Sequence, residues 1–296
     1  MKLADGETQT VAIVGTGEMG SAIGRRLREY GAWVTTSLLG RSAASARRVE
    51  RAGLEVRNDD QQLVDDAGFL LSIVPPAQAF SVAERFHEPL RRAKAKPIFV
   101  ECNAVSPATV RRIASLLDDT KCGFIDAAII GGPPPARRDP SARRTSVYAS
   151  GKDAVLLKGL TIHGLEVELL DEQIGSASAF KMCYGALTKG LTALGSVIIR
   201  AAARHNLAAA LRAELAQSQP EILKLLARRI PDMLAKAYRW EGEMEEIASF
   251  LDDDEAGASM FKGAAKLYSR LAEEVRQNPE LKSRELSMLL KFFDGI

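Results

Sequence analysis

Short apolar runs alternate with amphipathic segments along the first half of the chain. The apolar runs predict β-strands at residues 11–14, 33–38, 69–74, 98–100 and 123–130. The amphipathic segments predict helices at residues 19–30, 43–52, 78–86 and 107–117. Ser106 and Pro107 suit the N-cap and the first turn of the last of these helices. This alternation predicts an α/β fold with a doubly wound parallel sheet and right-handed crossovers.

The second half of the chain has a different pattern. Two further strand signals, at residues 145–149 and 166–170, end the alternation, and strong helix formers then predominate. Residues 176–204 contain no proline and predict one long helix. Its glycines, Gly185, Gly190 and Gly195, weaken the helix unless neighbouring helices pack closely against them. We therefore expect an α/β domain over residues 1–172 and an all-helical domain over residues 173–296.

A glycine-rich turn joins the first predicted strand to the first predicted helix. It reads Gly15-Thr16-Gly17-Glu18-Met19-Gly20. In a dinucleotide-binding turn the first glycine permits the tight turn, the second lets a pyrophosphate approach the backbone, and the third allows close helix packing. The helix N-terminus adds unpaired N–H groups and a partial positive charge. The turn and its position therefore predict a Rossmann domain that binds a nicotinamide dinucleotide through these residues.

The choice between NAD and NADP depends on the residues after the second strand. NAD-binding domains usually carry an acid there, about 20 residues after the glycines, which binds the ribose hydroxyls. This chain instead has Leu38-Leu39-Gly40-Arg41-Ser42, with no acid. Arg41 could pair with a 2′-phosphate, and a solvated loop arginine is the alternative. We expect Arg41 and Ser42 to contact the cofactor and NADP to be preferred, with NAD possible.

Composition and charge exclude several classes of protein. Forty Lys and Arg residues against 38 Asp and Glu leave a net charge of +2, too balanced for a dedicated nucleic-acid or membrane-surface binder. The three cysteines and three histidines form no disulfide framework and no metal motif, and each cysteine is expected to be a small buried hydrophobe. The N-terminus lacks the apolar core of a signal peptide, and residues 191–199 are too short an apolar stretch to span a bilayer. We expect a soluble cytoplasmic enzyme.

Several strings of residues together resemble the β-hydroxyacid dehydrogenase superfamily, which includes 6-phosphogluconate and 3-hydroxyisobutyrate dehydrogenases. They are the glycine turn with Met19, the Val74-Pro75-Pro76 string, and residues 101–107, 124–132 and 175–181. The nearest resemblance is to a poorly characterised phosphogluconate dehydrogenase-like branch. The resemblance implies a homodimer. It also implies cofactor contacts at Val74, Pro75, Pro76 and Asn103, and substrate contacts at Asn103, Gly131, Gly132 and Lys181.

The chain departs from the family pattern near the substrate. Ala177 replaces the second glycine of the lysine motif, and Ala104 stands where a threonine is usual. Gly185 stands four residues after Lys181, where the family has a substrate-binding asparagine. An arginine-bearing loop follows the three prolines after Gly132, and residues 137–144 either bind an anionic substrate or are solvated. The identity of the substrate therefore cannot be transferred from either named dehydrogenase.

Lys181 is the candidate acid/base that the resemblance implies. Oxidation of a secondary alcohol needs a base for the hydroxyl proton, and a lysine serves when burial and nearby cations lower its pKa. Tyr184 lies three residues later on the same helical face and could orient the substrate or donate a proton, or be a half-buried structural aromatic. Asn103 could bind a carboxylate or hydroxyl, or merely cap the turn before Ser106. Lys189 is expected to be structural or solvated, and the histidines are assigned no role.

These features predict an NADP-dependent dehydrogenase or reductase of a small, anionic hydroxy acid or its keto form, with no metal. Lys181 would be the acid/base and Tyr184 a second catalytic residue. Two alternatives remain open. One is an imine or ketone reductase, which Tyr184 and Gly185 favour and Lys181 disfavours. The other is an NADP(H)-binding regulatory protein without catalysis, which only the missing asparagine at position 185 supports.

Overall fold

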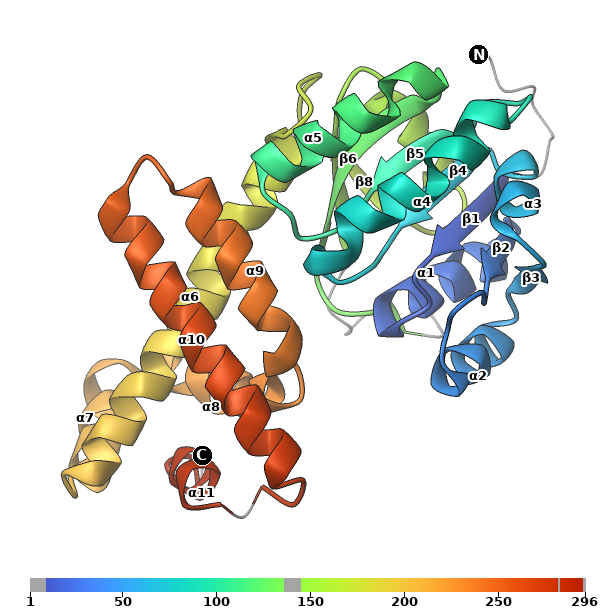
Figure 1. Cartoon of the computed structure of the whole chain (residues 1–296). Helices are drawn as coiled ribbons and strands as arrows, with labels where there is room; N and C mark the ends of the chain where they lie inside the picture. Colours follow the sequence, from blue (N-terminus) through green and yellow to red (C-terminus); the bar gives the residue numbers. More distant parts are fainter. Residues whose placement is uncertain (1–8, 136–144, 282, 295–296) are drawn as a thin grey trace. The chain divides into compact units, whose positions relative to one another are not determined.

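The computed structural model describes residues 9–135, 145–281 and 283–294 (Figure 1). The chain forms two compact units, Met1–Lys181 and Met182–Ile296. The boundary falls later than the expected position at residue 172, inside the long helix α6 (Ser176–Arg204). The reason is that backbone N–H groups at the start of α6 are hydrogen-bonded to side chains of the sheet, so its first turns belong to the first unit.

The first unit contains one sheet of eight strands in the order β3-β2-β1-β4-β5-β6-β7-β8. The strands are β1 (Thr10–Val14), β2 (Trp33–Ser37), β3 (Glu55–Arg57), β4 (Phe69–Ser72), β5 (Ile98–Glu101), β6 (Gly123–Ile130), β7 (Ser146–Ser150) and β8 (Glu166–Leu169). The six strands β1 to β6 run parallel in the Rossmann order, as predicted. Strand β7 is the exception, since it pairs antiparallel with β6, while β8 pairs parallel with β7.

Helices cover both faces of this sheet. The helices of the first unit are α1 (Glu18–Glu29), α2 (Ala43–Ala52), α3 (Asp60–Asp65), α4 (Ala79–Arg92) and α5 (Pro107–Leu117), with the 3₁₀ segments η1 (Pro76–Gln78), η2 (Asp118–Thr120) and η3 (Ala154–Thr161). Val11 and Ile13 of β1 pack with α1, α2 and η3, whereas Ala12 and Val14 pack with α3, α4 and α5. Figure 1 is seen from the side of α4 and α5. Two apolar cores, one on each face, therefore fix the sheet between helical layers.

The second unit is all-helical, as predicted. It contains α6 from Met182 onward, α7 (Ala208–Ser218), α8 (Pro220–Leu234), α9 (Ala237–Phe250), α10 (Glu255–Gln277) and α11 (Arg284–Lys291). The glycines of α6 are packing positions: a Cβ on Gly190 would lie 3.0 Å from Phe261 of α10, and one on Gly195 would lie 2.6 Å from Leu226 of α8. The expectation that neighbouring helices pack closely against these glycines is confirmed.

Polar contacts also fasten α6 within the second unit. Lys189 forms an ion pair with Glu243 and lies over the ring of Trp240, and its backbone carbonyl accepts a 2.6 Å hydrogen bond from buried Tyr268. Lys189 is thus structural. Residues 191–199 alone are too short to span a bilayer, but the whole of α6 is long and apolar enough to do so. Its glycines pack closely against α8 and α10, while other apolar side chains of the same helix are exposed.

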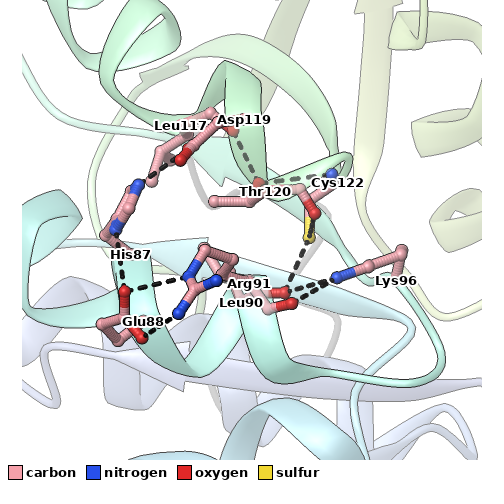
Figure 2. A network of polar contacts seen from close by, with 9 residues as sticks. All are labelled: His87, Glu88, Leu90, Arg91, Lys96, Leu117, Asp119, Thr120 and Cys122. Atoms are coloured by element: carbon pink, nitrogen blue, oxygen red, sulfur yellow. Dashed lines mark hydrogen bonds and ion pairs between the residues drawn. The ribbon is translucent and has the colours of Figure 1, made fainter.

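A polar network joins α4 to η2 at the amino ends of β5 and β6 (Figure 2). His87 Nε2 lies 2.7 Å from a carboxylate oxygen of Asp119, and Lys96 donates to the carbonyls of Leu90 and Arg91 at the end of α4. The lysine charge suits the negative end of the helix dipole. The network lies at the edge of the sheet opposite the glycine turn and ties the end of α4 to η2.

Candidate functional site

The glycine turn after β1 has three glycines with three different environments. Gly15 has φ +96°, and a Cβ there would lie 2.2 Å from the carbonyl oxygen of Ile73. A Cβ on Gly20 would lie 2.1 Å from the carbonyl oxygen of Gly15, so α1 can approach the turn only without a side chain. Gly17 is exposed and nothing lies within 4 Å of its Cβ position. Gly15 and Gly20 therefore serve close packing, and Gly17 leaves space for a pyrophosphate against the backbone.

The N-terminus of α1 adds donors beside this space. Gly17 is the N-cap residue and provides no side-chain cap for the first N–H groups of the helix. The hydroxyl of Thr16 is buried and has no hydrogen-bond partner among the described residues. Met19 packs against the apolar core that includes Val11 and Ile13, whereas Glu18 is exposed. Free backbone donors and an unsatisfied hydroxyl fit the phosphates of a dinucleotide.

Arg41 lies between the end of β2 and the start of α2. Burial, and then the charge of Arg85, lower the pKa of Arg41, while Asp60 opposes the shift. Asp60 is itself held by Arg85 through two hydrogen bonds of 2.6 and 2.7 Å. Ser42 caps α2 by accepting a 3.3 Å bond from the Ser45 N–H, so its hydroxyl has a structural partner. Arg41 is therefore a half-buried cation near the Arg85–Asp60 ion pair, and an anion bound to it would stabilise its charge.

Asn103 links the ends of β4 and β5. Its side-chain oxygen accepts a 2.6 Å bond from the Val74 N–H, and its amide donates at 2.9 Å to the Ser72 hydroxyl. The helix after this turn, α5, is capped by Ser106, which accepts a 3.3 Å bond from the Thr109 N–H. A Cβ on Gly15 would lie 2.7 Å from Val74. Asn103 thus fixes the Val74-Pro75-Pro76 segment beside the glycine turn.

Lys181 lies in the second turn of α6, against β6. Its ammonium group donates to the carbonyl oxygen of Ile129, near the carboxyl end of this strand. Gly131 and Gly132 follow directly and are exposed, and a Cβ on Gly132 would meet nothing within 4 Å. The carboxyl ends of β1, β4, β5 and β6 share one edge of the parallel sheet, so Lys181 lies at the same edge as the glycine turn.

Tyr184 and Gly185 follow Lys181 on α6 and belong to the second unit. Tyr184 belongs to the second unit and its side chain is 42% exposed. Gly185, where the family has an asparagine, is buried, and its Cβ position lies 3.4 Å from Ile247 of α9. The arginine loop at residues 137–144 lies outside the described residues. Cys183 is exposed, contrary to expectation, whereas Cys102 is buried.

Sequence reasoning gave no role to two buried carboxyl groups, Glu101 and Asp126. Burial raises the pKa of Glu101 to about 8, partly offset by hydrogen bonds from Asn103. Burial also raises the pKa of Asp126, and hydrogen bonds from Ser178, Gly175 and Ser150 oppose the rise. An acid in an otherwise apolar strand, at the end of β5 for Glu101 and inside β6 for Asp126, is the signal that could have identified both.

Residues 10–157 match the family described as the NAD-binding domain of 6-phosphogluconate dehydrogenase. The chain belongs to the β-hydroxyacid dehydrogenase superfamily. Residues 202–271 match a domain of unknown function, DUF1932. Membership makes the protein an NAD(P)-dependent oxidoreductase with a nicotinamide cofactor.

Three proteins resemble this chain along most of its length. An uncharacterised 28.5 kDa protein of Methanothermus fervidus is 26% identical, covering 89% of this chain and 99% of its own. A conserved protein of unknown function, described as structurally similar to 3-hydroxyacid dehydrogenases, has a TM-score of 0.65 and 29% identity, covering 90% of this chain and 98% of its own. The 3-hydroxyisobutyrate dehydrogenase of Mycobacterium tuberculosis has a TM-score of 0.71 and 15% identity, covering 96% and 99%. The last comparison shows a shared fold.

Proposed function

We propose that the protein transfers hydride between NADP and a small hydroxy acid or its keto form, with Lys181 as general acid/base. The observation that carries this proposal is the position of Lys181 at the end of β6, on the same sheet edge as the glycine turn. Ligands of open α/β sheets bind at this edge, outside the carboxyl ends of the strands. The fold thus supplies a proton-transfer group where the cofactor is expected.

The acid/base chemistry follows from the amine of Lys181. In the oxidative direction its neutral form takes the proton of the substrate hydroxyl while the carbonyl forms. The bound nicotinamide supplies the hydride acceptor. The resulting ammonium then faces the Ile129 carbonyl, which can accept its hydrogen bond, and releases the proton to solvent. In the reductive direction the ammonium returns that proton to the carbonyl oxygen.

NADP preference is proposed on the basis of Arg41. Its guanidinium is half-buried, close enough to Arg85 for their charges to interact, and no acid follows β2 that would repel a 2′-phosphate. A fork of donors on a rigid, always charged group suits a phosphate better than a ribose hydroxyl. Arg48 supports the arrangement by donating a 2.9 Å bond to the Thr16 carbonyl.

An anionic substrate is proposed because Lys181 carries a cation in its ammonium form and exposed backbone follows at Gly131 and Gly132. N–H groups of exposed glycines are available to carboxylate oxygens. The buried amide of Asn103 is engaged with Val74 and Ser72, so its proposed contribution is to place the segment that borders the cofactor.

The direct test is NADPH formation from NADP⁺ across a panel of phosphorylated and unphosphorylated hydroxy acids. The native protein, Lys181→Ala and Lys158→Ala are compared. Lys158 is the matched control, because its ammonium also donates to a strand carbonyl, that of Val167, at 2.6 Å. Turnover by the native protein and Lys158→Ala, with loss in Lys181→Ala, is expected. Equal turnover by all three would refute the role of Lys181.

Reduction of an imine or ketone is the second candidate. It is favoured by Gly185, which packs toward Ile247 and supplies no asparagine partner for the lysine. The same panel run in the reductive direction with imines and ketones decides between them. A regulatory protein without catalysis is expected to bind NADPH and turn over no compound in either direction.

We also propose a homodimer. Its support is an apolar stripe on α6 made of Tyr184, Leu187, Leu194 and Ile198, with exposed fractions of 42, 72, 58 and 47%. These residues recur at helical spacing on one side of the helix. An exposed apolar stripe of this kind is typical of an association surface.

A further inference from the structure

A row of polar side chains crosses the buried part of the sheet next to Lys181. Ser72, Glu101, Asp126 and Ser150 are register partners on the neighbouring strands β4, β5, β6 and β7. Each is at most 1% exposed. Partners in register project to the same face, which here is the face of α3, α4 and α5. Four adjacent buried polar groups in an apolar sheet need a reason beyond packing.

Asp126 uses its carboxylate to hold the beginning of α6. One oxygen accepts hydrogen bonds from the Gly175 N–H at 2.9 Å, the Ser178 N–H at 3.1 Å and the Ser150 hydroxyl at 3.1 Å. The other accepts from the Ser178 hydroxyl at 2.7 Å. The N–H groups of a first helical turn have no partner within the helix, and a negative charge there also suits the helix dipole. Asp126 therefore acts as a remote cap for α6.

Neighbouring residues also hold and enclose the start of the helix. Ser150 accepts a 3.0 Å bond from the Ala177 N–H, which closes the first turn on the same strand pair. Gly175 has φ +114°, and a Cβ there would lie 2.7 Å from the Arg111 guanidinium and 3.3 Å from Pro107. Lys181 follows Ser178 by three residues, so the turn that Asp126 holds also carries the lysine above it.

We propose that Asp126 is a positioning residue, which anchors the first turn of α6 to β6 and thereby sets Lys181 at the Ile129 carbonyl. The proposal rests on the acid/base role of Lys181 and extends it to a residue that touches neither substrate nor cofactor. The anchor and the lysine contact belong to the same pair of elements, β6 and α6. A shift of the anchored turn therefore moves the ammonium relative to the end of the strand.

The test combines hydrogen exchange with kinetics on Asp126→Asn, Ser178→Ala and Ser178→Thr. Ser196→Ala is the matched control, because Ser196 is a buried serine of the same helix whose hydroxyl bonds only to the Thr192 carbonyl, at 2.8 Å. Ser178→Ala removes a single hydroxyl and remains informative if Asp126→Asn does not fold. Exchange is read in the peptide that covers residues 174–181, and kcat, KM and the NADPH Kd are read on the same proteins.

Asp126→Asn and Ser178→Ala are expected to exchange about tenfold faster at this turn, since hydrogen bonds to a charged group stabilise it by about 1.5–3 kcal/mol. Their kcat is expected to fall about 10- to 100-fold, the cost of a misplaced catalytic group, while the NADPH Kd stays unchanged. Ser178→Thr keeps the hydroxyl and is expected to show the native exchange rate and the native kcat. Ser196→Ala is expected to alter neither quantity.

Unchanged exchange in both variants would overturn the anchor. Faster exchange with unaltered kcat, in an enzyme that requires Lys181, would overturn the positioning role. If Lys181→Ala keeps full turnover, the proposed function fails, and exchange at residues 174–181 still reports separately whether Asp126 anchors the helix.

Discussion

Glu101 and Asp126 are neighbours on β5 and β6, and both are buried. Their carboxyl groups differ in the hydrogen bonds that they accept. Asp126 accepts four hydrogen bonds, which support its charged form. Glu101 accepts one backbone bond, from Asn103, and its second oxygen has no partner among the described residues. Two adjacent carboxylates repel when both are ionised. The structure therefore favours a neutral Glu101 near neutral pH, while the hydrogen bonds to Asp126 oppose the rise that burial causes in its pKa.

This difference predicts how stability depends on pH. The pKa of Glu101 is about 8 in the folded protein against an ordinary value of 4.5, so the folded state keeps a proton that the unfolded state loses. The stabilisation is complete below pH 4.5 and is lost as pH rises toward 8, by up to about 1.4 kcal/mol per pH unit. Glu101→Gln removes this dependence, so its free energy of unfolding relative to the native protein should rise across that range.

Urea unfolding at pH 5, 6.5 and 8 measures the effect. Glu84→Gln is the control, because Glu84 is exposed on α4. The assignment of a neutral Glu101 would be contradicted if the free energies of unfolding of the native protein and Glu101→Gln differed by the same amount at all three pH values.

Arg41 carries a second prediction at this scale. Arg41→Ala should raise the KM for NADP⁺ about 10- to 100-fold, since a charge-assisted hydrogen bond contributes about 1.5–3 kcal/mol. The KM for NAD⁺ should change little, because NAD⁺ has no 2′-phosphate. Arg91→Ala is the control, since Arg91 is an exposed arginine paired with Glu88 at the opposite sheet edge. An equal rise for both cofactors would exclude Arg41 as the 2′-phosphate contact.

At the scale of elements, the sequence predicted the periodic helices and the apolar strands, and missed two short elements without a clear pattern. Helices 43–52, 107–117 and 176–204 have the predicted bounds. Strand β3 and helix α3 were missed, because a short edge strand and a helix of less than two turns show no measurable period. Helix α4 continues past the predicted end at residue 86 and through Pro89, because its buried stripe extends to Leu90.

The site residues also fall into those that local motifs indicate and those whose contacts join distant segments. The glycine turn was predicted from its motif and Lys181 from the family resemblance, because both depend on neighbours along the chain. The pairing of Glu101 with Asp126, and of Asp126 with α6, joins segments far apart in sequence and depends on sheet register. A pattern of single residues contains no such information. Asn103 was identified by its motif, while its bond to Val74 became evident only in the fold.

At the scale of the whole molecule, the proposed dimer depends on the apolar stripe of α6. Leu187→Asp should convert dimers to monomers, because burying an unpaired carboxylate in an apolar interface is strongly unfavourable. Met260→Asp is the matched control: Met260 is also 72% exposed but lies on α10. Light scattering coupled to size-exclusion chromatography measures the mass. A native monomer, or a Leu187→Asp dimer, would contradict the proposed surface.

The central claim is that Lys181 acts in proton transfer and not in cofactor binding. The most direct measurement compares the single-turnover rate of hydride transfer and the NADPH Kd in the native protein and Lys181→Ala, with the best substrate of the panel. We predict that the rate falls at least about 100-fold, as expected for loss of a general acid/base, while the NADPH Kd changes less than about threefold. An unchanged rate would contradict the account, as would a loss of rate fully explained by weaker NADPH binding.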